Sequence, residues 1–239
     1  MRTIVTADVH GNFKALKQCL KRSSFNYDED TLICLGDTCD GLPQTKECFD
    51  ELLKIKHLIY VMANHDFWCI QWMYKGNIFK HEDEFSYRSW YEQGGKATIQ
   101  SYGDNNKNVP EAHKTLLKRA EYYYVDNQNR LFVHGGYDTT KPIELNDSGY
   151  LMWDRSIIDT ARILRTHNEL RGTNIKLPTY NEVYIGHTHV GDVPINIVNL
   201  CCMDTGAGWK GRLTFKDIDT KEIWQSDTVE ELYGKQEGR

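Results

Sequence analysis

The sequence lacks the features that mark several specialised classes of protein. It contains 5 prolines in 239 residues and no low-complexity segment, so neither a disordered chain nor a linker is indicated. No apolar run approaches the length needed to cross a bilayer, and the apolar stretch at residues 1–7 is too short for a signal peptide. We therefore expect a cytoplasmic protein, in the host's cytosol if the source is viral, with no membrane partner.

Two further features are missing, namely a surplus of basic residues and paired cysteines. The 29 lysines and arginines are outnumbered by 34 acidic residues, so general binding to a nucleic-acid backbone is not expected. The 7 cysteines are odd in number and form no C-x-x-C pair, which argues against a disulfide framework and a structural zinc site. We interpret them as reduced thiols within one domain covering residues 1–239.

The N-terminal half contains a repeated pattern of strand, loop and helix. Apolar, β-branched runs at residues 3–7, 31–35 and 57–61 each precede a polar loop, and stretches with helical spacing follow. Such repeats imply parallel strands with helices packed outside, and their functional loops lie at the carboxyl ends of the strands. From about 67 to 125 the chain becomes helical and rich in aromatic residues, which favours an insertion with a packed aromatic core over an exposed cap.

The C-terminal half is dominated by predicted strands. Apolar runs at residues 130–133, 182–185 and 197–203 are followed by two alternating runs at 212–215 and 222–224. A short polar segment joins the last two runs, which suits a hairpin. We predict a mixed second sheet and an α/β (α+β) protein.

Side chains able to bind a metal ion follow these apolar runs. They are Asp8, His10, Asp37, Asn64, His134, His187 and His189. Carboxylate oxygen and imidazole nitrogen are ligands for divalent ions of intermediate hardness, and no thiolate is among them. Alternation along an extended chain would put Asp8 and His10 on one side, and likewise His187 and His189, so each pair could bind one ion. If Asp37 bridges two ions, together they could hold a phosphate oxygen and activate a water for in-line displacement.

The segments around these residues resemble the motifs of calcineurin-like metallophosphoesterases. The matching segments are Asp8-Val9-His10-Gly11, Gly36-Asp37-Thr38-Cys39-Asp40-Gly41, Asn64-His65-Asp66, Val133-His134-Gly135-Gly136 and Gly186-His187-Thr188-His189. Three further segments, which begin at Trp90, Met152 and Met203, are similar to the bacterial and phage phosphoprotein-phosphatase branch. That branch includes lambda phage protein phosphatase and the symmetrical diadenosine tetraphosphate hydrolases.

The resemblance implies a four-layer α/β/β/α sandwich of two mixed β-sheets flanked by helices. It also implies ligand roles: Asp8 and His10 would hold the first metal, Asp37 would bridge, and Asn64, His134 and His187 would hold the second. His65 would protonate the leaving oxygen, oriented by a hydrogen bond to Asp40. Phosphodiesterase-like relatives use a second histidine at the place of His189 as an extra ligand to the first metal, which we also expect here.

Two arginines of that branch are missing. Gly41 directly follows Asp40, where an arginine usually precedes the glycine, and Met62 with Ala63 replaces an Arg-Gly pair. Arg155 remains as the expected phosphate clamp. Fewer arginines would weaken the grip on a dianionic monoester relative to a diester or a pyrophosphate bond.

The sequence thus predicts a two-metal hydrolase of phosphate monoesters, similar to serine/threonine phosphatases. A metal-bridging water would attack phosphorus, His65 would be the general acid, and Arg155, Asn64 and His65 would bind the substrate, a phosphorylated protein or small molecule. The alternative is a dinucleoside polyphosphate hydrolase or a phosphodiesterase acting on nucleotides or RNA, and a non-catalytic scaffold is a third hypothesis. We expect two manganese ions (Mn²⁺), with Fe²⁺ or Zn²⁺ as alternatives. The oligomeric state is left open.

Overall fold

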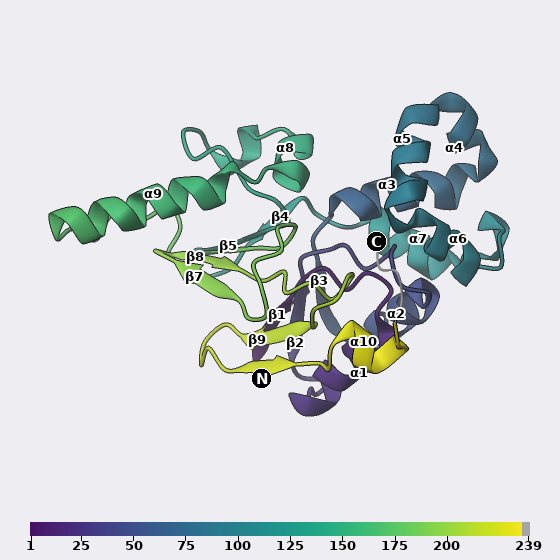
Figure 1. The fold of residues 1–239 in the computed structure, drawn as a ribbon, viewed down its shortest axis with the longest axis horizontal. Coiled ribbons are helices and arrows are strands. Elements are labelled where there is room, and N and C mark those ends of the chain that lie inside the picture. Colours follow the sequence, from purple (N-terminus) through teal and green to yellow (C-terminus); the bar gives the residue numbers. More distant parts are fainter. Residues whose placement is uncertain (236–239) are drawn as a thin grey trace.

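Two β-sheets lie face to face, with helices outside them (Figure 1). The computed structural model describes residues 1–235. Each sheet has 5 strands, and both sheets mix parallel with antiparallel pairs. Within the described residues, no helix combines the length and apolar character that spanning a membrane requires.

The first sheet is built on the three predicted strand, loop and helix units. In spatial order its strands are β10 (Ile223–Gln225), β9 (Thr214–Asp217), β1 (Thr3–Thr6), β2 (Thr31–Cys34) and β3 (His57–Tyr60). β1, β2 and β3 run parallel to one another. The predicted C-terminal hairpin, β9 with β10, does not join the second sheet, with which we grouped it from the sequence. It adds antiparallel to β1, so the end of the chain returns to the sheet in which it began.

The second sheet is mixed, as predicted. Its strands, in spatial order, are β4 (Tyr123–Val125), β5 (Arg130–Val133), β6 (Glu182–Ile185), β8 (Leu200–Cys202) and β7 (Ile195–Ile197). β5, β6 and β8 are parallel, while β4 and β7 form antiparallel edges. The carboxyl ends of the parallel strands therefore lie at one edge of each sheet.

Helices cover the outer faces of both sheets and fill the segment between β3 and β4. They are α1 (Phe13–Arg22), α2 (Thr45–Leu52), α3 (Asn64–Lys75), α4 (Asn77–Glu82), α5 (Glu84–Trp90), α6 (Lys96–Ser101), α7 (Glu111–Lys118), α8 (Ser148–Trp153), α9 (Ser156–Arg171) and α10 (Val229–Tyr233). Short helical turns lie at Tyr91–Gly95, Asn106–Asn108 and Ile143–Leu145. α9 extends away from the body of the molecule at the left of Figure 1.

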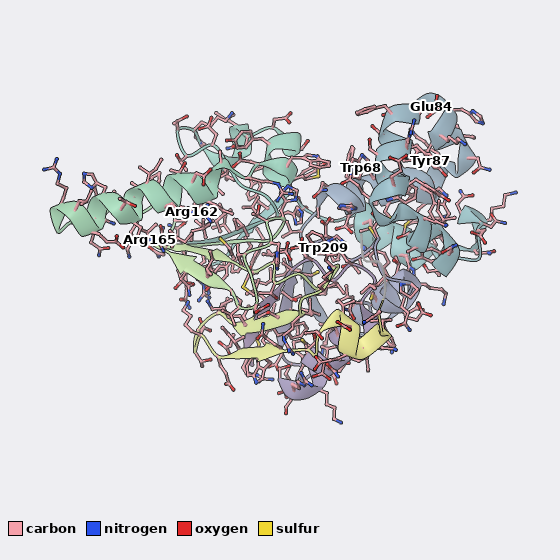
Figure 2. The ribbon with its side chains drawn as sticks, viewed as in Figure 1. Trp68, Glu84, Tyr87, Arg162, Arg165 and Trp209 are labelled. Atoms are coloured by element: carbon pink, nitrogen blue, oxygen red, sulfur yellow. The ribbon has the colours of Figure 1, made fainter. Side chains whose placement is uncertain are left out.

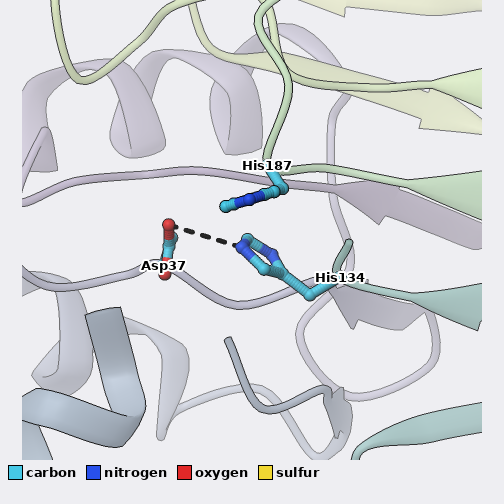
Figure 3. A group of neighbouring side chains, drawn as sticks. All are labelled: Asp37, His134 and His187. Carbon is cyan, nitrogen blue, oxygen red and sulfur yellow. Dashed lines mark ion pairs between the residues drawn. The ribbon is translucent and has the colours of Figure 1, made fainter. Parts of the chain in front are cut away.

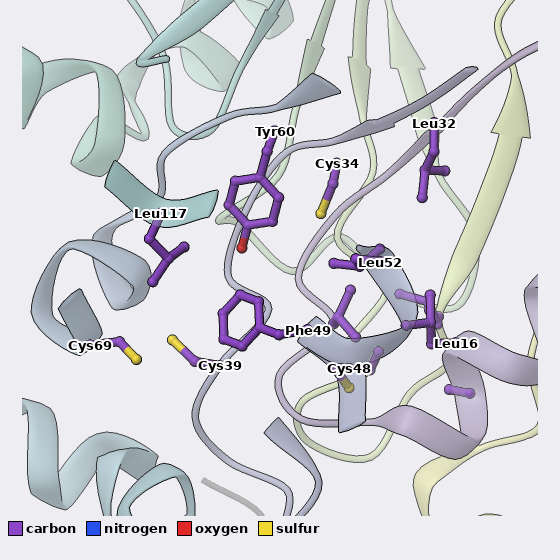
Figure 4. Close-up of a cluster of buried hydrophobic side chains, with 14 of the residues drawn as sticks. Leu16, Leu32, Cys34, Cys39, Cys48, Phe49, Leu52, Tyr60, Cys69 and Leu117 are labelled. Carbon is purple, nitrogen blue, oxygen red and sulfur yellow. The ribbon is translucent and has the colours of Figure 1, made fainter. Parts of the chain in front are cut away.

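Residues of β2 show how the layers are separated. Leu32 belongs to the buried cluster on the outer face of the first sheet, together with Leu16 of α1 and Phe49 of α2 (Figure 4). Ile33 points the other way, into the cluster between the sheets, to which Phe132 of β5 also belongs. The cause is the strand geometry, which sends successive side chains to opposite faces. Complete burial of each such side chain stabilises the fold by roughly 1.5–3 kcal/mol.

A third cluster closes the far side of the second sheet. Val133 of β5 and Ile185 of β6 share a buried cluster with Ile157 and Ala161 of α9. Three apolar interfaces thus separate four layers, which confirms the predicted α/β/β/α sandwich.

The aromatic residues of the segment between β3 and β4 form a packed core. Trp72, Phe79, Trp90 and Tyr102 are buried, and the Trp72 and Trp90 rings lie 6.0 Å apart between centroids. The exceptions, whose side chains are exposed, are Phe67, Tyr74, Phe85 and Tyr91. An aromatic core is therefore present, but only some of the aromatic residues of the segment belong to it.

One predicted strand is divided in the structure. The run at 197–203 contributes to two antiparallel strands, β7 and β8, which reverse direction at Val198 and Asn199. Val198 adopts the left-handed region (φ 50), and the Asn199 side chain hydrogen-bonds the backbone of Leu177 and Tyr180. A glycine usually occupies a left-handed position such as that of Val198. Because valine stands there, the apolar pattern gave no sign of the turn.

Candidate metal centre

The predicted ligands converge where the carboxyl ends of the parallel strands of both sheets meet. The first sheet contributes Asp8, His10, Asp37 and Asn64, and the second contributes His134 and His187. Backbone N–H groups hold the two carboxylates. The N–H of His65, in the first turn of α3, donates to Asp37 Oδ1 at 3.0 Å, and the N–H of His187 donates to Asp8 Oδ2 at 3.1 Å.

The backbone at these strand ends is strained. Asp8 (φ 55), His10 (φ 50), Asp37 (φ 50) and His187 (φ 63) all adopt the left-handed region, at a cost of roughly 1–3 kcal/mol for each non-glycine residue. β1 already ends at Thr6, so the prediction that Asp8 and His10 alternate along an extended chain is wrong. The turning loop, and not strand alternation, brings both side chains to Asp37.

Asp37 belongs to two groups of ligand-type side chains. One group is Asp37, His134 and His187 (Figure 3), and the other is Asp8, His10 and Asp37. Within each group the candidate ligand atoms lie within 4.8 Å of one another, and all of these residues are buried. A carboxylate shared by two such groups is what the predicted bridging position requires.

The Nε2 atom of His134 is surrounded by hydrogen-bond acceptors. Its Nδ1 lies 2.7 Å from the carbonyl oxygen of Leu35, which can only accept, so Nδ1 carries the proton. Nε2 then faces Asn64 Oδ1 at 2.9 Å and Asp37 Oδ2 at 3.5 Å. Burial lowers the pKa of His134, but the carboxylates of Asp37 and Asp8 outweigh it and raise the pKa to about 9. The surroundings of Nε2 thus demand a positive charge, which either a proton or a metal ion can supply.

His10 shows the same arrangement. Its Nδ1 lies 3.0 Å from the carbonyl oxygen of Cys39. Its Nε2 lies 3.6 Å from Asp37 Oδ2 and 3.9 Å from Asp8 Oδ1. A histidine that donates one ring N–H to a backbone carbonyl and turns the other nitrogen toward carboxylates has the orientation typical of a metal ligand.

His187 supplies the third nitrogen. Its Nε2 is buried and has no hydrogen-bond partner within residues 1–235. Burial, together with His134 and Arg155, lowers the pKa of His187 to about 2, so the ring is neutral and offers a lone pair. A buried lone pair without a donor, beside carboxylates, fits a divalent cation.

The two carboxylates are in different electrostatic states. Burial raises the pKa of Asp8 well above its ordinary value, and the neighbouring Asp204 carboxylate adds to the effect. Burial would also raise the pKa of Asp37, but His134 and His65 reverse this and hold it well below the ordinary value. The surroundings therefore favour the anionic form more strongly at the shared carboxylate than at Asp8.

His65 and Asp40 form a hydrogen-bonded pair beside the centre. His65 Nδ1 lies 2.7 Å from Asp40 Oδ2, and both side chains are buried. The His65 ring packs edge-on against that of His10, with centroids 5.2 Å apart. The predicted pair of His65 and Asp40 therefore lies directly beside the candidate ligand His10.

Asp66 has a position in the site that we did not anticipate from the sequence. Its carboxylate accepts hydrogen bonds from the backbone N–H groups of Asp37 (2.8 Å) and Thr38 (3.3 Å), and from the Tyr60 hydroxyl (3.0 Å). Burial and the Asp37 charge raise the pKa of Asp66 to about 7. Asp66 thus fixes the loop that carries Asp37, and its place directly after Asn64 and His65 is the one sequence signal that pointed to it.

A cavity of about 380 Å³ opens over the centre. Its lining combines candidate ligands with residues from the helical segment and from the loop after β8, namely His10, Glu92, Gln93, Arg155, His187, His189, Asp204, Gly206, Gly208 and Trp209. Trp209, labelled near the middle of Figure 2, is 53% exposed and is a residue that we did not single out from the sequence.

Arg155 and His189 lie in this cavity but differ in how they are held. Arg155 Nη1 donates to the carbonyl oxygen of His187 at 2.9 Å and to Thr188 Oγ1 at 3.1 Å. This leaves other N–H groups of the guanidinium, which carries five donors in all. His189 is exposed and belongs to neither ligand group found in residues 1–235. Its expected role as a ligand stays a prediction.

Comparison with known sequences gives a consistent result. A family described as calcineurin-like phosphoesterase matches residues 1–191. A serine/threonine-protein phosphatase 2 from Salmonella typhimurium is 24% identical over 221 residues, which cover 90% of this chain and 91% of that protein. A symmetrical bis(5'-nucleosyl)-tetraphosphatase from Neisseria gonorrhoeae is 25% identical over 259 residues, which cover 91% of this chain and 92% of that protein.

Solved structures share the fold at low sequence identity. One that is provisionally assigned as a diadenosine tetraphosphatase has a TM-score of 0.67 and 15% identity, and the match covers 94% of this chain and 92% of that chain. A metallophosphoesterase from Sphaerobacter thermophilus has a TM-score of 0.56 and 18% identity, covering 96% of this chain and 88% of that chain.

Proposed function

The chain belongs to the calcineurin-like phosphoesterase family and is a hydrolase of phosphate esters, and we propose that it acts on phosphate monoesters with two divalent cations. One observation carries the proposal. The nitrogens of His10 and His134 turn toward carboxylate and amide oxygens around Asp37, and the buried Nε2 of His187 has no donor within residues 1–235. Such a set of acceptors is balanced by cations.

We assign the ligands as the sequence predicted. Asp8 and His10 would hold one cation, with His189 as a further ligand. The other cation would be held by Asn64, His134 and His187. Asp37 would contact both cations. When bound, the cations would lower the pKa of the attacking water and neutralise charge on the phosphate oxygens. Manganese is our expectation, and Fe²⁺ or Zn²⁺ suits the same ligands.

The remaining work falls to the chain's own residues. Arg155 would grip phosphate oxygens through the guanidinium donors that His187 and Thr188 do not engage. Asn64 and His65 would contact the phosphate from the start of α3. The Nδ1 of His65 is hydrogen-bonded to Asp40, so Nε2 is the nitrogen that can transfer a proton to the leaving oxygen.

The test is phosphate release after chelator treatment and reloading with Mn²⁺. We expect release from p-nitrophenyl phosphate and from a phosphoserine peptide, with no release before metal is added. A protein that stays inactive with Mn²⁺, Fe²⁺ and Zn²⁺ supplied in turn would contradict the proposal and would favour the non-catalytic scaffold.

A second candidate is hydrolysis of a dinucleoside polyphosphate or of a phosphodiester. Two observations favour it: the relative named as a bis(5'-nucleosyl)-tetraphosphatase, and the presence of a single arginine among the described residues that line the cavity. Met62 and Ala63, which stand where the branch has Arg-Gly, are both buried and add no charge to the site. Turnover of p-nitrophenyl phosphate, its bis ester and a symmetrical dinucleoside tetraphosphate should be compared side by side. A strong preference for the monoester would exclude this candidate.

A further inference from the structure

We propose that Trp90 and Thr98 are positioning residues for the Asp40–His65 pair, and that the helical segment between β3 and β4 thereby controls proton transfer to the leaving group. This inference rests on the proposed role of His65 as the general acid. Neither residue lines the cavity, so each would act only through Asp40.

Both oxygens of the Asp40 carboxylate are held by the helical segment. The indole N–H of Trp90, the last residue of α5, donates to Oδ2 at 2.8 Å, and the hydroxyl of Thr98 in α6 donates to Oδ1 at 2.7 Å. The backbone N–H of Asp40 in turn donates to the Thr98 hydroxyl oxygen at 2.9 Å. These three bonds fix the carboxylate in position and in rotation.

The bonding pattern also decides which nitrogen of His65 carries a proton. An indole nitrogen can only donate, so Oδ2 of Asp40 is an acceptor for Trp90 and for His65 alike. His65 must therefore donate from Nδ1, over the 2.7 Å distance to Oδ2. Because Nδ1 is engaged with Asp40, Nε2 is the nitrogen that can transfer a proton to the leaving oxygen.

The local backbone brings the two elements together. The turn at Tyr91–Gly95, between α5 and α6, approaches the loop after β2 so closely that a side chain at Gly94 (φ 108) would overlap the backbone of Gly41. The N–H of Gly41 donates to the carbonyl oxygen of Gly94 at 3.2 Å. Asp40 itself adopts the left-handed region (φ 71), a conformation that its surroundings must hold in place.

Filling the core is the simpler role that Trp90 could have. Its ring is fully buried and packs against Trp72 and Phe79. A core role and a positioning role make different predictions, because loss of packing harms every substrate while loss of a general acid harms only substrates with poor leaving groups. A p-nitrophenolate ion leaves without a proton, whereas an alkoxide does not.

The experiment measures kcat for p-nitrophenyl phosphate and for a simple alkyl phosphate in the Mn²⁺-loaded full chain. We expect Trp90→Phe and Thr98→Val to lower kcat for the alkyl phosphate by ~10-fold, a part of the 10²- to 10⁴-fold that a general acid supplies. For p-nitrophenyl phosphate both variants should stay within ~3-fold of the wild type, since that step needs little acid catalysis. Thr98→Ser, which keeps the hydroxyl, should restore the alkyl phosphate rate.

Trp72→Phe is the matched control, because it removes a second buried indole that neighbours Trp90 and is not bonded to Asp40. It should change both substrates by the same factor. Thermal melting and metal content are measured for every variant, and if Trp90→Phe does not fold, the Thr98 pair decides. An equal loss on both substrates, or no loss on either, overturns the inference.

His65→Ala separates this inference from the proposed function. If His65→Ala shows the leaving-group dependence and the Trp90 and Thr98 variants do not, only the positioning role is wrong. If His65→Ala shows no such dependence, the acid role of His65 is wrong and the positioning role is overturned with it.

Discussion

Asp37 and Asp40 lie in the same loop after β2, and both carboxylates are buried, yet their side-chain partners are of opposite kinds. Beside Asp37 stand His10 and His134, which each turn toward it a nitrogen that is an acceptor when the ring is neutral. The Asp40 carboxylate, in contrast, accepts hydrogen bonds from Trp90, Thr98 and His65, and these are its side-chain partners within residues 1–235. The same loop therefore carries Asp37, a candidate metal ligand, and Asp40, whose carboxylate orients His65.

The two regions also differ in where their charge is balanced. Around Asp37 the acceptors are balanced when positive charge enters the site, either as a proton on His134 or as the cations proposed above. Around Asp40 every acceptor has a donor within the protein, so this region needs no ion and holds one histidine in one tautomer.

The largest effect is expected at the shared carboxylate. Asp37→Ala should abolish hydrolysis at every Mn²⁺ concentration, because the shared ligand of both groups is lost. The measurement is phosphate release across a Mn²⁺ titration. Asp227→Ala, which removes a carboxylate far along the chain whose partners are Arg22 and Gln18, is the control and should keep full activity. Substantial activity of Asp37→Ala would show that Asp37 is not an essential metal ligand.

The next effect is expected at the proton-handling region. His65→Ala should lower kcat for alkyl phosphates by roughly 10²- to 10⁴-fold while the protein still binds metal, because His65 belongs to the donor side of the contrast. Steady-state kinetics and metal analysis on the same preparation check this. Loss of metal together with activity would show that the two regions are not separate.

A smaller effect is expected at Arg155. Arg155→Ala should raise KM for a monoester by roughly 10-fold, since a charge-assisted hydrogen bond contributes about 1.5–3 kcal/mol. Arg155→Lys should recover part of the loss, because the charge returns without the planar fork. A KM equal to that of the wild type in both variants would remove Arg155 from the substrate site.

The smallest effect lies outside the site and concerns stability. Glu51 of α2 accepts hydrogen bonds from Lys17 (2.8 Å), Lys54 (2.7 Å) and Tyr27 (2.5 Å). Burial raises the pKa of Glu51, but these donors outweigh it and lower the pKa from 4.5 to about 2. Because the folded-state pKa lies below the unfolded value, the stabilisation is complete above about pH 4.5 and is lost as the pH falls toward 2.

Glu51→Gln should therefore lower the free energy of unfolding by roughly 1–2 kcal/mol at pH 7, a value reduced because both lysines reach solvent. The difference from the wild type should shrink below pH 4.5, and kcat should not change. Urea unfolding at a series of pH values measures it. A difference that is independent of pH would mean that packing, and not charge, is what the substitution removes.

The sequence was sufficient to predict the parts of the structure that depend on local pattern. Apolar runs followed by polar loops predicted β1, β2 and β3, and the rule that functional loops gather at strand ends predicted that Asp8, Asp37 and Asn64 would meet. The alternating pattern of β9 and β10 predicted a hairpin. It could not indicate that this hairpin joins β1, because edge pairing depends on contacts across the whole chain.

The parts that could not be predicted depend on long-range or strained geometry. Trp90 and Thr98 reach Asp40 across 50 and 58 residues, and no local periodicity encodes such hydrogen bonds. The left-handed backbone of Asp8 and Asp37 is equally invisible, because these are not glycines. Local rules fail most at the site itself, where strain is held in place by the surrounding fold.

The most direct test of the contrast is a count of metal ions on the chelator-stripped protein during titration with Mn²⁺. We expect saturable binding of two ions per chain in the wild type, two in His65→Ala, and loss of that binding in Asp37→Ala. Absence of saturable binding in the wild type, or binding that Asp37→Ala leaves unchanged, would contradict it.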